Sequence, residues 1–218
     1  MFTPIPIKRN DEFYSNYWEG YSPKLKRDVD FFGDLRYEYW LLIETNPDIV
    51  SFCERPISIE GVINGKKRRT QFDMWLKWKD GRDFFVKVIY SSKKESFLRE
   101  VEELWCKNNG YEYLIVTEQE IRSNPIVLSN KKQLLSSLGN RVIPIEIDIL
   151  KITKQITEER TTIKLIIDYF KEGMPLLRIK EALYWMIYQG IISSNMDEKP
   201  LSPETEVWLN VKTKDHRM

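Results

Sequence analysis

The stretch from Arg68 to Tyr90, RRTQFDMWLKWKDGRDFFVKVIY, decides the fold of the first part of the chain. It predicts two strands, TQFDMWLKW and DFFVKVIYS, joined by a tight turn at Asp80-Gly81. In the first strand, alternation places Phe72 and Met74 on one face and Asp73 on the other. The second strand is apolar on nearly both faces, which is typical of a central strand covered on both sides.

Two polar residues in these strands indicate chemistry. Asp73 lies in the first strand, and Lys87 follows 14 residues later in the apolar second strand. A Mg²⁺-dependent phosphodiester hydrolase needs carboxylate ligands and a cation near the phosphate, so this pair is half of such a site. One fold with this chemistry carries a Glu/Gln-x-Lys triplet in the second strand, with the Glu or Gln as a metal ligand. Phe85 occupies the position of that ligand, on the same face as Lys87. A solvated aspartate and a snorkelling lysine are the alternative interpretation.

The sequence on either side of these strands predicts an α/β unit with a mixed sheet. Residues 1–30 are polar and aromatic, and we expect them to be irregular. The predicted elements are a helix in 32–48, a strand in 49–62 before the Asn64-Gly65 turn, a helix from Ser91 or Ser92 to Gly110, a strand in 111–118 and helical pieces in 118–138.

The character of the sequence changes near residue 145, and we expect a second domain there. Residues 143–159 are predicted to connect the two parts. Two amphipathic helices flank Gly173-Met174-Pro175, and two short strands follow Gly190. Helix, turn, helix and strand pair outline a small winged helix-turn-helix. The predicted domains are 1–148 and 149–218.

Composition bounds the function. The chain has 218 residues, is 42% hydrophobic and 31% charged, and carries a net charge of +1. It therefore buries a core, and any DNA contact must come from local basic clusters. Cys53 and Cys106 stand far apart, which argues against a zinc site or disulfide framework and favours a reducing compartment. No apolar run approaches 18 residues and the N-terminus lacks a signal-peptide pattern, so we expect a cytoplasmic protein without membrane partners.

The single histidine, His216, stands near the C-terminus. Ser-His-Asp and Cys-His catalysis need an internal histidine, and histidine-based zinc sites need two or more. An enzyme with this sequence would rely on carboxylates, lysines and a hard metal such as Mg²⁺.

Two basic clusters are candidate DNA-phosphate contacts. They are Lys66, Lys67, Arg68 and Arg69 at the predicted hairpin, and Lys93 and Lys94 at the start of the next helix. A solvated turn is the alternative interpretation of the first cluster. In the second domain, Arg178 and Lys180 either face a major groove or belong to a protein-docking module, and the near-zero charge of residues 161–218 favours docking.

Four stretches resemble the TnsA family, the endonuclease subunit of heteromeric transposases, in order and with similar spacing. They are LLIETNPDIVSFCERP (41–56), RRTQFDMWLKWKDGRDFFVKV (68–88), YEYLIVTEQEIR (111–122) and ALYWMIYQGIISSNMDEKPLSPETEVWL (182–209). The resemblance spans about residues 20–210. It implies a restriction-endonuclease-like domain followed by a winged-helix domain in a bacterial cytoplasmic protein.

The resemblance also implies a role. A TnsA subunit cuts the 5′ strands at transposon ends, while a TnsB-like transposase cuts and joins the 3′ ends and a TnsC-like AAA+ ATPase regulates the complex. Carried over to this sequence, Asp73 is a Mg²⁺ ligand and Lys87 is the active-site lysine.

The sequence departs from the family at two site positions. Arg36 stands where the family has its helix glutamate, eight residues before Glu44, and Phe85 stands where it has Glu or Gln. Glu38 is the leading replacement acid, although two residues correspond to about 200° around a helix. An ion pair between Arg36 and Asp73 that fills the metal position is our hypothesis.

Three functions stay open on the sequence alone. The first is a working Mg²⁺ endonuclease that uses Asp73, Lys87 and Glu38. The second is a catalytically silent TnsA-like subunit for DNA positioning and partner binding. The third is a restriction or defence nuclease built on the same domains.

Overall fold

The computed structural model describes residues 2–7, 15–63, 65–93, 98–139 and 143–210 and shows a mixed α/β protein. The chain divides into two compact units, Met1–Glu44 with Asp48–Ser123 and Thr45–Pro47 with Asn124–Met218. The second unit therefore begins before the predicted boundary at 148/149. The reason is that α4 (Pro125–Leu138) packs against α7 (Leu176–Tyr188), so that α4 belongs to the second unit.

A four-stranded mixed sheet forms the centre of the first unit, as predicted. Its strands are β3 (Ile49–Glu54), β6 (Met74–Trp78), β7 (Asp83–Ile89) and β8 (Glu112–Thr117), in the order β3-β6-β7-β8. The pairs β3–β6 and β6–β7 are antiparallel, whereas β7 and β8 are parallel. A parallel pair needs a crossover connection, and helix α2 (Arg99–Asn108) lies in it.

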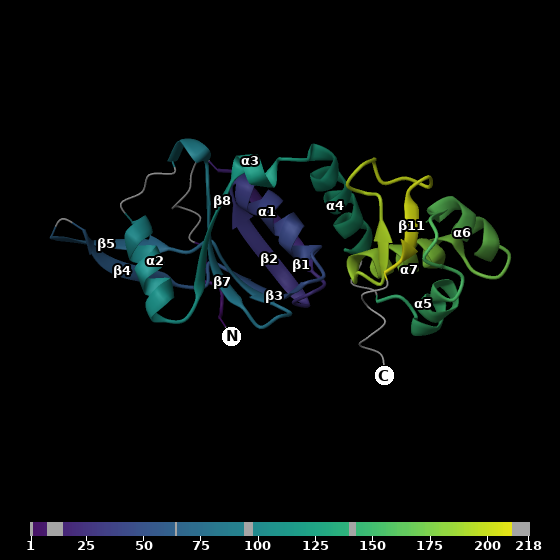
Figure 1. Cartoon of the computed structure of the whole chain (residues 1–218), viewed down its shortest axis with the longest axis horizontal. Coiled ribbons are helices and arrows are strands. Elements are labelled where there is room, and N and C mark those ends of the chain that lie inside the picture. The colour runs from purple at the N-terminus through teal and green to yellow at the C-terminus, as the bar shows by residue number, and fades with distance from the viewer. Residues whose placement is uncertain (1, 8–14, 64, 94–97, 140–142, 211–218) are drawn as a thin grey trace. The chain divides into compact units, whose positions relative to one another are not determined.

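Helices cover both sides of this sheet. Helix α1 (Asp34–Glu44) lies on one side and α2 on the other (Figure 1). The adjacent residues Phe85 and Val86 point to opposite faces of β7, and each is 0% exposed. This confirms the prediction that the second strand of the opening stretch is buried on both faces.

Residues expected to be irregular form a β-hairpin instead. Strands β1 (Tyr17–Ser22) and β2 (Arg27–Phe32) pair in an antiparallel two-stranded sheet. Val29 and Phe31 alternate in β2 and are buried, while their neighbours Asp28 and Asp30 are charged. The high charge of this segment concealed its period-two pattern, and the prediction for residues 1–30 was wrong here.

The predicted strand over residues 70–78 is broken at Phe72 and Asp73. Strand β5 (Lys66–Gln71) ends before these residues and pairs with β4 (Ser58–Ile63) in a separate hairpin, and β6 begins after them. Because the break interrupts alternation, Phe72 packs in the same cluster as Trp75 and Phe85. The predicted face of Phe72 was therefore wrong.

The second unit combines helices with a small antiparallel sheet. Its elements after α4 are α5 (Glu146–Thr153), β9 (Thr161–Thr162), α6 (Ile163–Phe170), α7, β10 (Ile192–Ser194) and β11 (Glu206–Leu209), with sheet order β10-β11-β9. The two helices around Gly173 and both short strands are confirmed. The predicted connector over 143–159 instead contains α5, because Ile152 is buried and Asp148 binds Arg178.

Arg178 is consequently engaged inside its own unit. Its Nε and Nη2 atoms donate to both carboxylate oxygens of Asp148, at 2.8 and 2.7 Å. This bidentate pair links α7 to α5 within the second unit.

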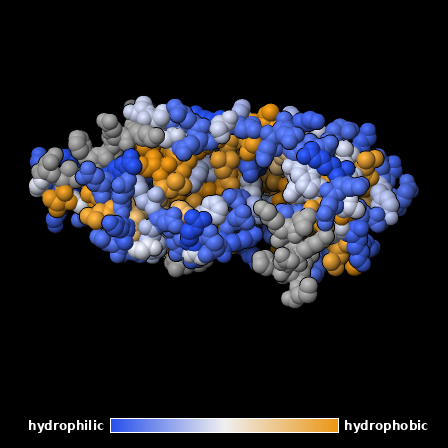
Figure 2. Space-filling model, viewed as in Figure 1, coloured by the Kyte–Doolittle hydropathy of each residue, from blue (hydrophilic) through white to orange (hydrophobic). Residues whose placement is uncertain are grey.

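The face of the molecule in Figure 2 is hydrophilic over most of its area, with apolar side chains gathered in patches. Strand β8 is an edge strand of the four-stranded sheet, and its Leu114 is exposed. Within the described parts of the chain, every helix is too short or too polar to cross a membrane.

Candidate functional site

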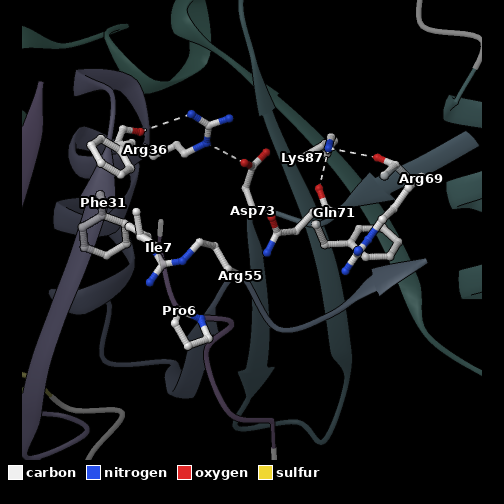
Figure 3. A pocket seen from close by; sticks show the side chains of 12 residues that line it. Pro6, Ile7, Phe31, Arg36, Arg55, Arg69, Gln71, Asp73 and Lys87 are labelled. Carbon is white, nitrogen blue, oxygen red and sulfur yellow. Dashed lines mark hydrogen bonds and ion pairs between the residues drawn. The ribbon is translucent and has the colours of Figure 1, made fainter. Parts of the chain in front are cut away.

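A cationic cavity of about 350 Å³ lies in the first unit, around Asp73 (Figure 3). It is lined by Pro6, Ile7, Phe31, Phe32, Arg36, Arg55, Arg69, Thr70, Gln71, Phe72, Asp73 and Lys87. The structure thus brings together the two predicted catalytic residues, the departure at Arg36 and one residue of the basic cluster. Among the described residues, four cationic side chains and a single carboxylate line the cavity.

Asp73 is fixed by its backbone and by its side chain. Its N–H donates to the Val86 carbonyl at 3.0 Å, and its carbonyl accepts from the Arg55 N–H at 2.9 Å. One carboxylate oxygen, Oδ2, accepts the backbone N–H of Val88 at 2.7 Å. The side chain is only 8% exposed, so a buried carboxylate here depends on these partners.

The predicted ion pair between Arg36 and Asp73 is present. Nε of Arg36 donates to Oδ1 of Asp73 at 2.5 Å, and Nη1 donates to the Phe32 carbonyl at 3.1 Å. Arg36 lies in the first turn of α1, whose buried Leu35 and Tyr39 fix the rotation of the helix. Both oxygens of Asp73 therefore have a donor, one cationic and one from the backbone.

Lys87 is held by oxygen atoms on the other side of the cavity. Its Nζ donates to the Gln71 carbonyl at 2.5 Å and to Thr70 Oγ1 at 3.3 Å. It also forms an ion pair with Glu102 at 3.4 Å. The lysine is thus an internal partner of α2 as well as a lining residue.

Glu102 is a site residue that the sequence reasoning missed. The carboxylate is almost fully buried and accepts hydrogen bonds from Thr70 Oγ1 and Tyr113 Oη, both at 2.5 Å. Burial of Tyr113, and then its hydrogen bond to Glu102, raise the pKa of the phenol far above its usual value. The available signal was the position of Glu102 four residues before Cys106, on the buried stripe of α2.

Phe85 does not line the cavity. It is 0% exposed and packs in an aromatic cluster under α2. Its ring centroid lies 5.2 Å from that of Phe2, 4.8 Å from Phe72, 5.2 Å from Trp105 and 4.9 Å from Tyr111. The position at which the resemblance implies a metal ligand is therefore part of the hydrophobic core.

Glu38 does not join Asp73. Its carboxylate accepts from Arg122 Nε at 2.6 Å and Nη2 at 3.2 Å, and it does not line the cavity. Two residues along α1 turn its side chain about 200° away from Arg36. The interpretation of Glu38 as a replacement catalytic acid is corrected by this geometry.

The residues at this site do not fit Mg²⁺. The ion prefers near-octahedral oxygen coordination, usually through one or two carboxylates. Here Asp73 is engaged by Arg36 and Val88, and Phe85 has no ligand atom. Among the residues that the structure describes, no three His, Cys, Asp or Glu side chains form a group that could hold a metal.

The basic cluster lies along strand β5. Lys66, Lys67, Arg68 and Arg69 are all exposed, and Arg69 alone of the four lines the cavity. Strand alternation places Lys67 on the face of Arg69, and Lys66 and Arg68 on the other. Lys93 ends the short 3₁₀ turn Ser91–Lys93, and helix α2 begins only at Arg99. The Lys93 side chain, Lys94, Asn64 and His216 lie outside the described residues.

The two cysteines do not supply a nucleophile. Cys53 and Cys106 are both buried and unpaired, in the cluster that contains Phe85. Burial raises the pKa of Cys53 to about 11 and that of Cys106 to about 12. Both thiols are therefore protonated at neutral pH, and the thiolate is the reactive form.

We expect Asp73→Ala to lower the free energy of unfolding by about 2–4 kcal/mol, because the Val88 amide and the Arg36 guanidinium both lose their acceptor. Asp73→Asn keeps one acceptor and is expected to lose less. Urea unfolding followed by circular dichroism measures both. Asp48→Ala is the control, since its pair with Lys79 is exposed and we expect it to stay close to wild type. Equal losses for Asp73→Ala and Asp48→Ala would contradict the prediction.

Comparison with known proteins adds no relationship: no protein-family model matches the sequence, and no curated protein matches it.

Proposed function

We propose that the chain is a non-cleaving TnsA-like subunit of a DNA transposition complex, which holds transposon-end DNA on a nuclease scaffold. One observation carries the proposal: Arg36 donates to the carboxylate of Asp73 at 2.5 Å. The family resemblance makes that carboxylate a Mg²⁺ ligand, and here a guanidinium takes the place of the metal.

The element order supports a restriction-endonuclease-like scaffold. Helix α1 precedes three antiparallel strands, and α2 leads to the parallel strand β8. Asp73 stands immediately before β6 and Lys87 lies within β7, as the resemblance implies. In the second unit, α6, α7 and the β10–β11 hairpin support a winged helix, with β9 as the third strand of its sheet.

The residues at the cavity favour binding over hydrolysis. Hydrolysis of a phosphodiester needs an activated water and stabilisation of the developing charge. Cations remain here, but among the described lining residues no carboxylate is free to hold a metal that would activate water. Exposed basic side chains along β5 can contact DNA phosphates without chemistry, and each such contact makes the affinity depend on salt.

In this role, the partner proteins carry out the cleavage and joining of the DNA strands. A TnsB-like transposase would cut and join the 3′ strands, and a TnsC-like AAA+ ATPase would regulate the complex. The restriction or defence nuclease alternative needs the same metal-dependent cleavage as a working TnsA subunit. The donor set around Asp73 therefore counts against both.

The test is a nicking assay on transposon-end DNA with the partner transposase, in Mg²⁺ and in Mn²⁺. We expect no 5′-strand nicks and unchanged assembly of the complex, because the site lacks a metal-binding carboxylate pair. A 5′ nick that disappears in Asp73→Ala would overturn the non-cleaving role.

The same preparation tests the binding role. Lys66→Glu with Arg68→Glu is expected to weaken DNA binding and reduce its salt dependence, because two phosphate contacts are lost. Lys154→Glu, an exposed charge reversal in the second unit, is the control. Equal effects of the two variants would contradict the assignment of β5 as the DNA-contacting strand.

A further inference from the structure

The apolar side chains of the cavity gather on one side of Asp73. Figure 3 shows Pro6, Ile7 and Phe31 there, with the carboxylate-paired Arg36 and Arg55 beside them, and it shows Arg69 and Lys87 on the other side of Asp73. A phosphate alone would satisfy only the charged side. A ligand that satisfies both sides carries an anionic group and an apolar or flat body.

The apolar wall is held in place by the N-terminal segment. The Ile5 N–H donates to the Arg55 carbonyl at 3.0 Å, and Arg55 Nε donates to the Ile5 carbonyl at 2.9 Å. Arg55 also binds the Asp30 carboxylate of β2 at 2.5 Å. Pro6 and Ile7 follow directly, so the wall they form is part of the folded unit.

The charge of the cavity matches one phosphate. Arg36, Lys87 and Arg55 are each compensated by a carboxylate, those of Asp73, Glu102 and Asp30. The side chain of Arg69 makes no hydrogen bond or ion pair within the described part of the chain. One positive charge is therefore uncompensated, which suits a single phosphate better than a di- or triphosphate.

Gln71 adds an unused hydrogen-bond donor to the lining of the cavity. Its side-chain Nε2 is buried and has no hydrogen-bond partner among the described residues. Buried donors are nearly always paired, so an unpaired one beside a cavity is a reason to look for an acceptor supplied by a ligand.

We infer that the cavity binds one unpaired nucleotide of DNA, with its phosphate near Arg69 and Gln71 and its base against the apolar wall. The cavity volume of about 350 Å³ lies in the range of small-ligand sites. In an intact duplex the bases are stacked inside and cannot reach the apolar wall, whereas an unstacked nucleotide can. The inference rests on the proposed function in taking DNA as the ligand, and it adds which part of DNA enters the site.

An unpaired nucleotide has two sources, a single-stranded tail at a strand end and an internal gap. Fluorescence anisotropy with a blunt duplex, a tailed duplex and a gapped duplex of equal length distinguishes them. We expect the tailed or the gapped duplex to bind about tenfold more tightly than the blunt one, the tenfold corresponding to about 1.4 kcal/mol. The DNA that shows the gain identifies the source.

Neighbouring residues of β5 provide matched variants. Arg69→Ala and Gln71→Leu are expected to abolish the preference for unpaired DNA, and Gln71→Leu, which removes no cation of β5, is expected to keep blunt-duplex binding. Arg68→Ala, an exposed neighbour that does not line the cavity, is expected to keep the preference. For Arg69→Ala, the slope of log K against log salt on the preferred DNA is expected to fall by about 1.

The outcomes separate the two proposals. Equal binding of all three DNAs by the wild-type protein, or an equal loss of the preference for unpaired DNA in Arg68→Ala and Arg69→Ala, would overturn the nucleotide site alone. Absence of binding to every DNA would overturn the proposed function as well. Urea unfolding of Gln71→Leu completes the test, since a loss of stability equal to that of a core variant would show a structural role instead.

Discussion

Phe85→Gln is expected to destabilise the first unit by about 3–5 kcal/mol and to restore no cleavage. Glutamine is one of the residue types that the family resemblance places at this position. The native ring is fully buried among other aromatic side chains, and removing it loses contact energy and leaves a cavity. The amide would also be buried without a partner, which adds a desolvation cost.

Urea unfolding measures the change, and Phe85→Leu is the matched control. Leucine keeps an apolar side chain of moderate volume, so we expect it to lose less stability than glutamine. Nicking of transposon-end DNA by Phe85→Gln in Mn²⁺ is expected to stay absent, because Arg36 still occupies Asp73. A Phe85→Gln protein that is as stable as wild type and cleaves DNA would refute this account of the site.

Under the proposed function, positions 36 and 85 are the two where the resemblance implies metal ligands, and a substitution at either one disturbs the packing around it. A carboxylate at position 36 would remove the partner of Asp73, and a polar residue at position 85 would enter an aromatic core. Arg36 and Phe85 lie at different parts of the site, Arg36 on α1 and Phe85 under α2.

Glu102→Ala is the second change for which we expect a large effect, a loss of about 3–5 kcal/mol. The carboxylate is almost fully buried and serves three groups at once, Lys87, Thr70 and Tyr113. Its removal leaves a partly buried ammonium and two hydroxyls without their acceptor. Chemical unfolding of the purified protein measures the loss.

The next residue provides the control. Glu103 is exposed and pairs with Arg99 one helical turn away, so Glu103→Ala is expected to stay near wild type. A double-mutant cycle then isolates the ion pair. Glu102→Gln combined with Lys87→Met is expected to be less destabilising than the sum of the single variants, because no unpaired charge remains. Additive losses would contradict a coupled pair.

Several elements were predictable because their signals are local. Turn residues at Asp80-Gly81 and an apolar run after them were sufficient to predict β7 in the centre of a sheet. The same holds for α6 and α7, whose periodicity and the Gly173–Pro175 turn are contained in one stretch of sequence. The ion pair between Arg36 and Asp73 could also be predicted, because the family resemblance places these two distant positions in one site.

Other features depended on contacts between distant segments. The break at Phe72 and Asp73 follows from the change of strand partner between β5 and β6, and alternation within one strand cannot show it. Glu38 is a strong candidate in sequence because it is an acid near position 36. In the folded chain, its rotation around α1 brings it to Arg122 instead.

The sequence by itself determined that this protein is a mixed α/β chain, with Asp73 and Lys87 in two consecutive segments of one sheet. Only the tertiary structure decided what those residues contact: Arg36 on the carboxylate of Asp73, Glu102 on the ammonium of Lys87, and an aromatic cluster around Phe85. Periodicity gives the face on which a side chain lies. Its partner across that face comes from another segment, because packing of the whole unit fixes which distant groups meet.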